Sequence, residues 1–246
     1  MAEPLEPPAG APPPPQPKPP APTAQDAPLA ELPAGWRELG DLAFERALDA
    51  WIPVGGARRL APSDLSALAT ALDEGGAVSV RAAVLLARTR DPHAGDVLLA
   101  QLEERAPPSS AKPASDAALV VAAAAFAEGT PGSNAAARLG GLATGRRPHP
   151  DPFVRVECAR SALRLGRDEV VPYLLQVLRT GTTAGRTLSK EDRPEDVAWM
   201  QIRAADALSR RAGTERRFEP EASVRAREEE AARLEALLRG PGEKKR

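Results

Sequence analysis

The stretch that decides the fold runs from Val154 to Gly166 and reads Val-Arg-Val-Glu-Cys-Ala-Arg-Ser-Ala-Leu-Arg-Leu-Gly. Its apolar residues recur at helical spacing on two stripes. The first stripe consists of Val154, Cys158, Ala162 and Leu165, and the second of Val156, Ala159 and Leu163. A surface helix needs only one apolar stripe, so two stripes predict a helix that is buried on two sides, as inside a stack of helices.

The pattern of this stretch recurs earlier in the chain. The run that begins at Val78 aligns with the run that begins at Val154, at an offset of 76 residues. The segments that follow them, 91–102 and 167–178, align at the same offset. Repetition at a fixed spacing is typical of architectures in which each unit is a small group of helices.

Two further copies complete the series. Residues 120–123 lie halfway between the first two, where a period of 38 places a copy, although this middle unit lacks an Asp-Pro turn and its second helix is weak and contains glycine. Residues 202–208 follow the copy at Val154 at an offset of 46, because a polar loop, 180–196, precedes them. One helix pair cannot bury two stripes, but neighbouring pairs can, so we expect one continuous core.

Three segments carry a resemblance to a known family. Val154 to Gly166 resembles the first helix of a HEAT-like repeat, of the kind also found in phycobilisome-lyase-type proteins. Glu169 to Leu175 resembles the start of the second helix, including the inner proline, and Asp91-Pro92 lies where the family places its turn between the two helices. The resemblance covers roughly residues 60–213, and it implies a right-handed α-solenoid of about four to five HEAT-like helix pairs. Lyases of that family act on bilins, but nothing here matches a chromophore-handling site, so we do not transfer that activity.

The chain divides into five expected parts. They are a disordered Pro/Ala-rich tail (1–33), an N-terminal cap (34–60), the repeats (61–213), a C-terminal capping helix (214–239) and a charged tail (240–246). The first part holds 13 of the 27 prolines, which fix the backbone and remove hydrogen-bond donors. We expect it to be a semi-rigid tether, with a docking peptide for a proline-recognition domain as the alternative.

Both ends of the expected stack carry helical patterns. At the N-terminal end the residues at helical spacing are Trp36, Leu39, Leu42, Ala43 and Ala47. Ser63 is the expected N-cap of the next helix. The last helix has a narrow apolar stripe of Val224, Ala231, Leu234 and Leu238, and it offers the ion pairs Glu229–Arg233 and Glu235–Arg239 at favourable spacing. This helix is expected to cap the stack, with a coiled-coil contact to a partner as the alternative.

Composition excludes several classes of protein. Hydrophobic residues make up 42% of the 246 residues but aromatic residues only 3%, and alanine and leucine dominate, which favours helices over strands. The net charge of −1 lacks the basic excess of most nucleic-acid binders. No apolar run is long enough for a membrane span. No signal peptide precedes the chain as written, so we expect a cytoplasmic protein, exported only if Met1 replaces a removed signal.

No residue pattern points to catalysis, a cofactor or a metal. His93 and His149 have no neighbouring ligands at metal-binding spacing, so we interpret them as turn residues. The single cysteine, Cys158, lies on a stripe that we expect to be buried, where thiols are inert. The glycines at 140–141 belong to a helical stretch and not to a phosphate-binding loop. We therefore expect no catalytic residues, no cofactor and no metal.

The leading hypothesis is a scaffold that binds a protein partner along a concave face lined by the second helices of the repeats. The exposed candidates on that face are Asp96, Gln101, Glu169, Tyr173, Gln176 and Arg179. The alternative is a nucleic-acid-binding solenoid with a basic rim of arginine pairs, namely Arg58, Arg59, Arg146, Arg147, Arg210 and Arg211. Cations are also favourable at helix C-termini, which explains these pairs without a ligand, and aromatic residues for base stacking are scarce. An enzyme is the third and least favoured hypothesis.

Overall fold

The computed structural model describes residues 29–53, 56–104, 113–130, 133–190 and 192–239, with the backbone alone for 29–30 and 113–118. The charged C-terminal tail and most of the proline-rich tail lie outside these residues. The described part is all-α, as predicted, apart from one pair of two-residue strands. Its helices are α1 (Asp41–Trp51), α2 (Pro62–Glu74), α3 (Gly76–Thr89), α4 (Pro92–Glu104), α5 (Pro113–Gly129), α6 (Ala135–Thr144), α7 (Pro152–Arg164), the 3-10 helix η2 (Asp168–Val170), α8 (Val171–Leu178), α9 (Pro194–Arg211) and α10 (Val224–Arg239).

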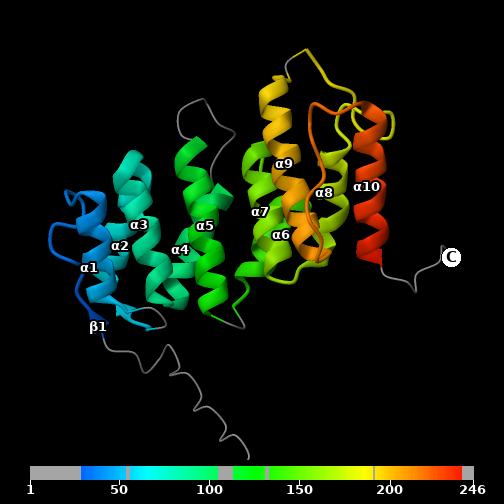
Figure 1. Ribbon diagram of the computed structural model, residues 1–246. Coiled ribbons are helices and arrows are strands. Elements are labelled where there is room, and N and C mark those ends of the chain that lie inside the picture. The colour runs from blue at the N-terminus through cyan, green and yellow to red at the C-terminus, as the bar shows by residue number, and fades with distance from the viewer. Residues whose placement is uncertain (1–28, 54–55, 105–112, 131–132, 191, 240–246) are drawn as a thin grey trace, which may run out of the picture.

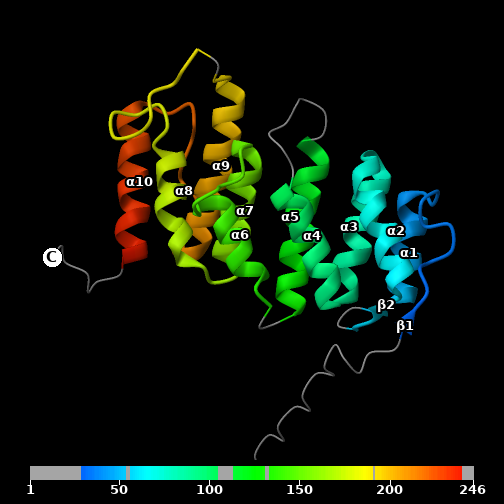
Figure 2. The same ribbon diagram turned by 180° about the vertical axis from the view of Figure 1, so that it is seen from behind.

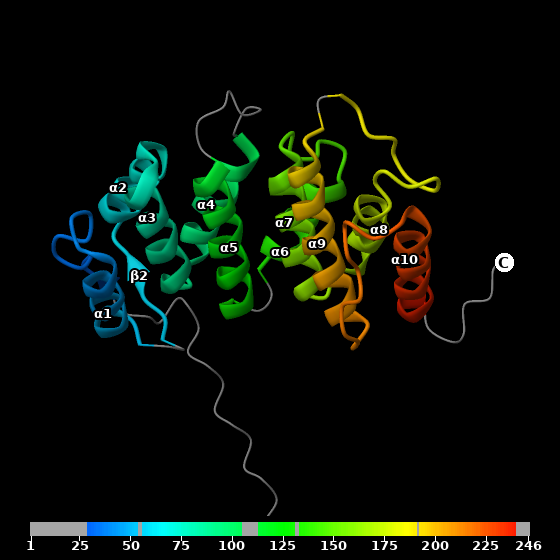
Figure 3. The ribbon, with the colours of Figure 1, turned by 45° about the horizontal axis from the view of Figure 1, so that its top comes forward.

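The helices form two layers, which Figures 1 and 2 show from opposite sides. Helices α3, α5, α7 and α9 pack against one another in sequence, and we call them the first-helix layer. Helices α4, α6 and α8 lie behind them as the second-helix layer. Consecutive helices from α2 to α9 alternate in direction, so the helices of one layer run the same way (Figure 1). Figure 3 shows the row extending from α1 at one end to α10 at the other.

The four recurring segments all lie in the first-helix layer, one in each of its helices. The apolar stripes of α7 are buried as predicted, because α7 packs against α5, α6 and α9 together. Leu165 is the exception: it follows the last helical residue and is half-buried. Gly166 then adopts φ +85°, a left-handed conformation that closes the helix, with Arg167 N donating to Ala162 O.

Small residues allow the layers to approach closely. A Cβ atom on Gly95 of α4 would lie 2.2 Å from Cε1 of Phe126 on α5, so only glycine fits between these helices. Alanines fill much of the same interface. From Leu119 onward most side chains of α5 are buried, but Val121 is 58% exposed and Ala125 is exposed as well. One narrow face of α5 therefore remains uncovered.

The N-terminal end differs from the prediction in two respects. Leu42 is 72% exposed, and the core side of α1 is formed by Phe44 and Leu48 instead. The prediction of the buried face of α1 was wrong because it treated Trp36 as part of the same helix. Trp36 lies in a turn before α1. Helix α2 begins at Pro62 after Ala61, so Ser63 lies in its first turn and is not the N-cap. Proline at the first helical position is favourable because the missing N–H has no partner there.

The end of the proline-rich segment belongs to the folded part. The short strands β1 (Leu29–Ala30) and β2 (Arg59–Leu60) pair in parallel, and Nε1 of Trp51 donates to the carbonyl of Glu31 at 2.6 Å. Leu32 packs against the core. The tail predicted to end at residue 33 is therefore structured from residue 29 onward.

Helix α10 covers the other end with a mixture of apolar and charged contacts. Ala231 and Leu234 are buried and Leu238 is half-buried, but Val224 is exposed at the first turn. The expected Glu235–Arg239 pair forms, whereas the expected Glu229–Arg233 pair does not. Glu229 pairs instead with Arg225 at 2.8 Å, and Arg233 pairs with Glu230 at 2.6 Å.

Candidate binding face

The six residues expected to line a groove on the second helices are dispersed. Three of them form ion pairs within the molecule: Asp96 with Arg138, Glu169 with Arg167, and Arg179 with Glu235. Tyr173 is half-buried under the guanidinium of Arg155, 4.6 Å from its ring centre, and burial raises the pKa of its hydroxyl. Gln101 is half-buried on α4, and Gln176 is exposed on α8. Arg179 lines a hollow of about 580 Å³ between α8 and α10.

The six arginines of the expected basic rim do not share one edge. Arg58 donates its backbone N–H to Thr89 O at the C-terminal end of α3, and Arg59 follows it. Arg210 and Arg211 occupy the last turn of α9, which runs parallel to α3. Arg146 and Arg147 follow the end of α6, which runs the opposite way, so they lie at the other edge. Each pair still lies near a helix C-terminus, where the helix dipole favours cations.

Equivalent positions of the four recurring segments lie along one side of the first-helix layer. Each copy has a residue directly before its pair of small residues, and these four residues are Arg81, Val121, Glu157 and Arg203. We call them row one. Two helical turns later, each copy presents a second residue, and these are Arg88, Glu128, Arg164 and Arg210, which we call row two. Residues seven positions apart lie on the same side of a helix, so the two rows run along one face.

The first half of this face contains a mainly apolar hollow with charged residues at its margin. This hollow of about 730 Å³ is lined chiefly by α3 and α5, with residues of α1, α7 and α9 as well, and its charged lining residues are Arg88, Arg90, Glu128, Glu157 and Arg203. We call it the apolar hollow, and its apolar lining includes Val80, Val84, Ala87, Val121 and Ala125. Val80 and Val121 are 36% and 58% exposed, although they are large apolar residues in a well-packed helix layer. Exposed apolar residues that gather in a hollow are typical of a binding surface.

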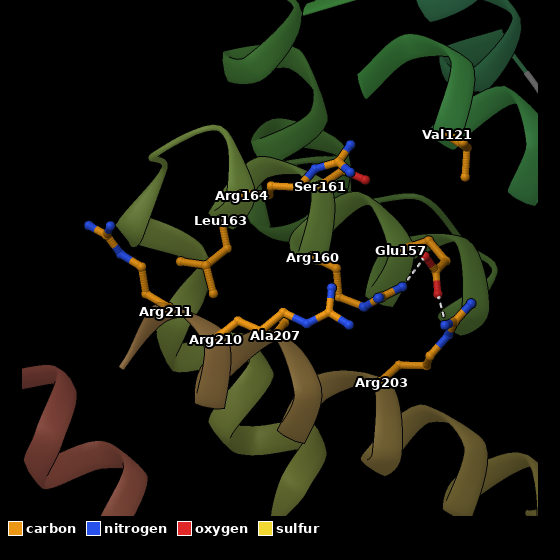
Figure 4. Close-up of a pocket in the computed structure, with 10 residues that line it drawn as sticks. All are labelled: Val121, Glu157, Arg160, Ser161, Leu163, Arg164, Arg203, Ala207, Arg210 and Arg211. Carbon is orange, nitrogen blue, oxygen red and sulfur yellow. Dashed lines mark hydrogen bonds and ion pairs between the residues drawn. The ribbon is translucent and has the colours of Figure 1, made fainter. Parts of the chain in front are cut away.

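The second half of the face is basic. A hollow of about 510 Å³ between α7 and α9 is lined by five arginines, namely Arg160, Arg164, Arg203, Arg210 and Arg211, with Glu157 as its one acidic residue. We call it the arginine hollow (Figure 4). In this view Arg210 extends to the side of Arg160, Arg160 and Arg203 are both turned toward Glu157, and Arg211 points away from them. Val121, Glu157 and Arg203 line both hollows, so the two are continuous.

Glu157 organises the arginine hollow. Its side chain is only 7% exposed, and its carboxylate binds Arg160 at 2.6 Å on its own helix and Arg203 at 3.1 Å on α9. A buried carboxylate needs such partners, since an unpaired charge would be costly to desolvate. Burial lowers the pKa of Arg160 from its ordinary value, and Glu157 opposes that effect. The sequence carried one signal for this residue, the i, i+3 spacing of Glu157 and Arg160.

The remaining expected residues take structural positions. Cys158 is buried, and desolvation raises the pKa of its thiol far above the ordinary range, with a further contribution from Glu157. His93 is exposed beside Asp91, and His149 is buried, where its Nδ1 accepts from the backbone of Asp151. In the described ranges no three His, Cys, Asp or Glu side chains gather as metal ligands would. No helix in the same ranges has both the length and the apolar character needed to cross a membrane.

Comparisons with protein-family models, with curated proteins and with solved structures find no match to this chain. The interpretation of its function therefore rests on the residues and their geometry.

Proposed function

We propose that the chain is a right-handed α-solenoid of about four to five HEAT-like helix pairs, and that it binds a segment of another protein and has no catalytic activity. The order of the copies supports the architecture, because the recurring segments occupy successive helices of one layer. The covered ends support it as well, because α1 and α10 differ from the repeated units and shield the terminal helices.

The observation that carries the binding proposal is the continuity of the apolar hollow with the arginine hollow. A partner segment that lies across the first-helix layer would place apolar side chains against α3 and α5 and acidic side chains against α7 and α9. Val121 and Arg203, which line both hollows, would lie where the two parts of it meet. Complementary charge fixes the direction in which such a segment binds, while the apolar contacts supply most of the affinity.

This proposal locates the groove on the first helices and not on the second helices that the sequence favoured. Most second-helix candidates are engaged with their own molecule, as the pairs of Asp96, Glu169 and Arg179 illustrate. The first-helix face instead combines exposed valines with guanidinium groups from neighbouring helices.

A selection from a displayed library of random peptides on the full chain tests the proposal. We expect the enriched peptides to combine apolar residues with nearby aspartate or glutamate. Val121→Asp should weaken their binding about tenfold or more, because it places a carboxylate in the apolar hollow. The matched control is Val224→Asp, the same change at an exposed valine on α10, which should leave binding unchanged.

Two results would contradict the proposal. Enriched peptides without acidic residues, or peptides that bind Val121→Asp as well as the wild type, would remove the groove from this face. Tight binding of a short duplex DNA, with a steep loss of affinity in salt and dependence on Arg146 and Arg147, would favour the nucleic-acid alternative.

A further inference from the structure

The last residue of row two, Arg210, has no ion-pair partner among the described residues. Arg88 pairs with Asp49 of α1 at 2.5 Å, and Glu128 pairs with Arg164 across α5 and α7 at 2.9 Å. Among the described residues, Arg210 pairs with no carboxylate. Its side chain nevertheless lines the arginine hollow and extends on the side of Arg160 (Figure 4). A cleft lined mostly by charges of one sign raises the local concentration of ions of the opposite charge.

The two arginines on Glu157 also retain donors. The Nε atoms of Arg160 and Arg203 are buried and donate to no acceptor in the described structure. Arg160 uses Nη1 for Glu157, and the Nε of Arg203 lies 3.1 Å from the carboxylate without donating a hydrogen bond to it. The Oε1 of Glu157 is likewise buried without a hydrogen bond, 3.1 Å from the Nε of Arg203, so this ion pair does not use the full hydrogen-bonding capacity of either group. Among the lining residues of the hollow, Glu157 is the one carboxylate against five guanidiniums.

We infer that the arginine hollow binds a phosphate monoester carried on a side chain of the partner segment. This inference rests on the proposed function and specifies which anion the arginine hollow binds. A single guanidinium can donate two parallel hydrogen bonds to one carboxylate, so a carboxylate needs only one arginine. A phosphate monoester carries nearly two negative charges and three acceptor oxygens, so it can accept from Arg160 on α7 and from Arg203 and Arg210 on α9 together.

Glu157 acts as a positioning residue in this site. It holds Arg160 and Arg203 on the two sides of the hollow, so their guanidiniums do not have to be ordered when the anion arrives. Arg210 contributes the charge that no internal carboxylate offsets. Arg164 and Arg211 have their own partners, Glu128 and Asp168, and lie at the margin of the site.

Titration of the full chain with phenyl phosphate, and separately with benzoate, tests the inference by isothermal calorimetry. The two probes share a ring and differ in the anion. We expect phenyl phosphate to bind about tenfold or more tightly than benzoate. Its affinity should fall as the pH drops below about 6, where the phosphate loses its second charge. Arg210→Gln should weaken phenyl phosphate binding about tenfold and leave the thermal unfolding unchanged, because Arg210 is exposed and unpaired.

The matched control is Arg146→Gln, which removes the same charge at the opposite edge and should leave the affinity unchanged. Equal affinity for the two probes, no binding of phenyl phosphate, or an Arg210→Gln variant that binds like the wild type would overturn the inference. So would a short duplex DNA that displaces phenyl phosphate more effectively than a phosphorylated peptide does. If the selected peptides still bind while phenyl phosphate does not, only this inference fails and the proposed function stands.

Discussion

At the scale of single residues, Glu157 contradicts the simplest interpretation of its helix. The two apolar stripes between Val154 and Leu165 are predicted to be packing residues, and all of them except Leu165 are buried. Glu157 lies among them, and its carboxylate pairs with Arg203, which occupies the equivalent position in the next copy. Neighbouring copies therefore present opposite charges at the same position, which joins α7 to α9. Removal of one partner from such a pair leaves a buried charge uncompensated.

Cys158, the neighbour of Glu157, gives a direct test of burial in α7. Its thiol is enclosed, and its raised pKa leaves almost no thiolate at neutral pH. We expect a thiol-reactive reagent to label the native protein only as fast as the protein unfolds, and to label it at once in denaturant. The Cys158→Ala variant, which leaves no thiol, is the control for labelling elsewhere. Rapid labelling of the native protein would show that α7 is exposed and would contradict the packing of the layer.

At the scale of elements, α10 is held by carboxylates as well as by apolar burial. Glu235 accepts from Arg179 of α8, and Glu228 accepts from the hydroxyl of Thr183 and the backbone N–H of Ala184. These hydrogen bonds lower the pKa values of both carboxyl groups, and a bond from Arg233 lowers that of Glu230. The helix is thus attached to the end of the stack by groups that titrate in acid.

Acid should therefore weaken the attachment of α10. A carboxylate whose pKa is lower in the folded state contributes stability above its unfolded pKa, which is about 4.3 for glutamate. That contribution is lost as the pH falls through the lower, folded pKa. We expect the thermal midpoint of the wild type to fall between about pH 5 and pH 3, and Glu235→Gln to reduce this fall. Glu221→Gln, a change at an exposed residue outside these contacts, should behave like the wild type. Identical pH profiles for the wild type and Glu235→Gln would contradict this role of Glu235.

Periodicity predicted which segments are helical, but not every boundary or orientation. The stripes of α7 lie where spacing placed them, since a packed helix has to bury its apolar residues. The face of α1 was misjudged because Trp36 is part of a preceding turn, and no local pattern separates that turn from the helix. The α10 pairs were predicted in part, because Glu229 has arginines at both i−4 and i+4 and the sequence does not rank them.

At the scale of the whole molecule, the candidate site was beyond the reach of sequence analysis. Which layer carries the hollows depends on the distances between neighbouring helices. Those distances depend on side-chain packing, such as the contact of Gly95 with Phe126. The arginine pairs were visible in the sequence as pairs, but the alternation of helix direction separates Arg146 and Arg147 from the others. Arg203, which lines both hollows, was not a candidate because it has no arginine neighbour in the sequence.

The central claim is that the partner segment lies on the first-helix layer, and site-specific photo-crosslinking tests it most directly. A photoreactive amino acid is introduced either at Ala125, exposed in the apolar hollow on α5, or at Gln176, exposed on α8 in the second-helix layer. Each full-length variant is irradiated with the peptide that the library selection enriches. We predict a crosslink from position 125 and none from position 176. A crosslink from position 176 alone would return the binding groove to the second helices and contradict the account.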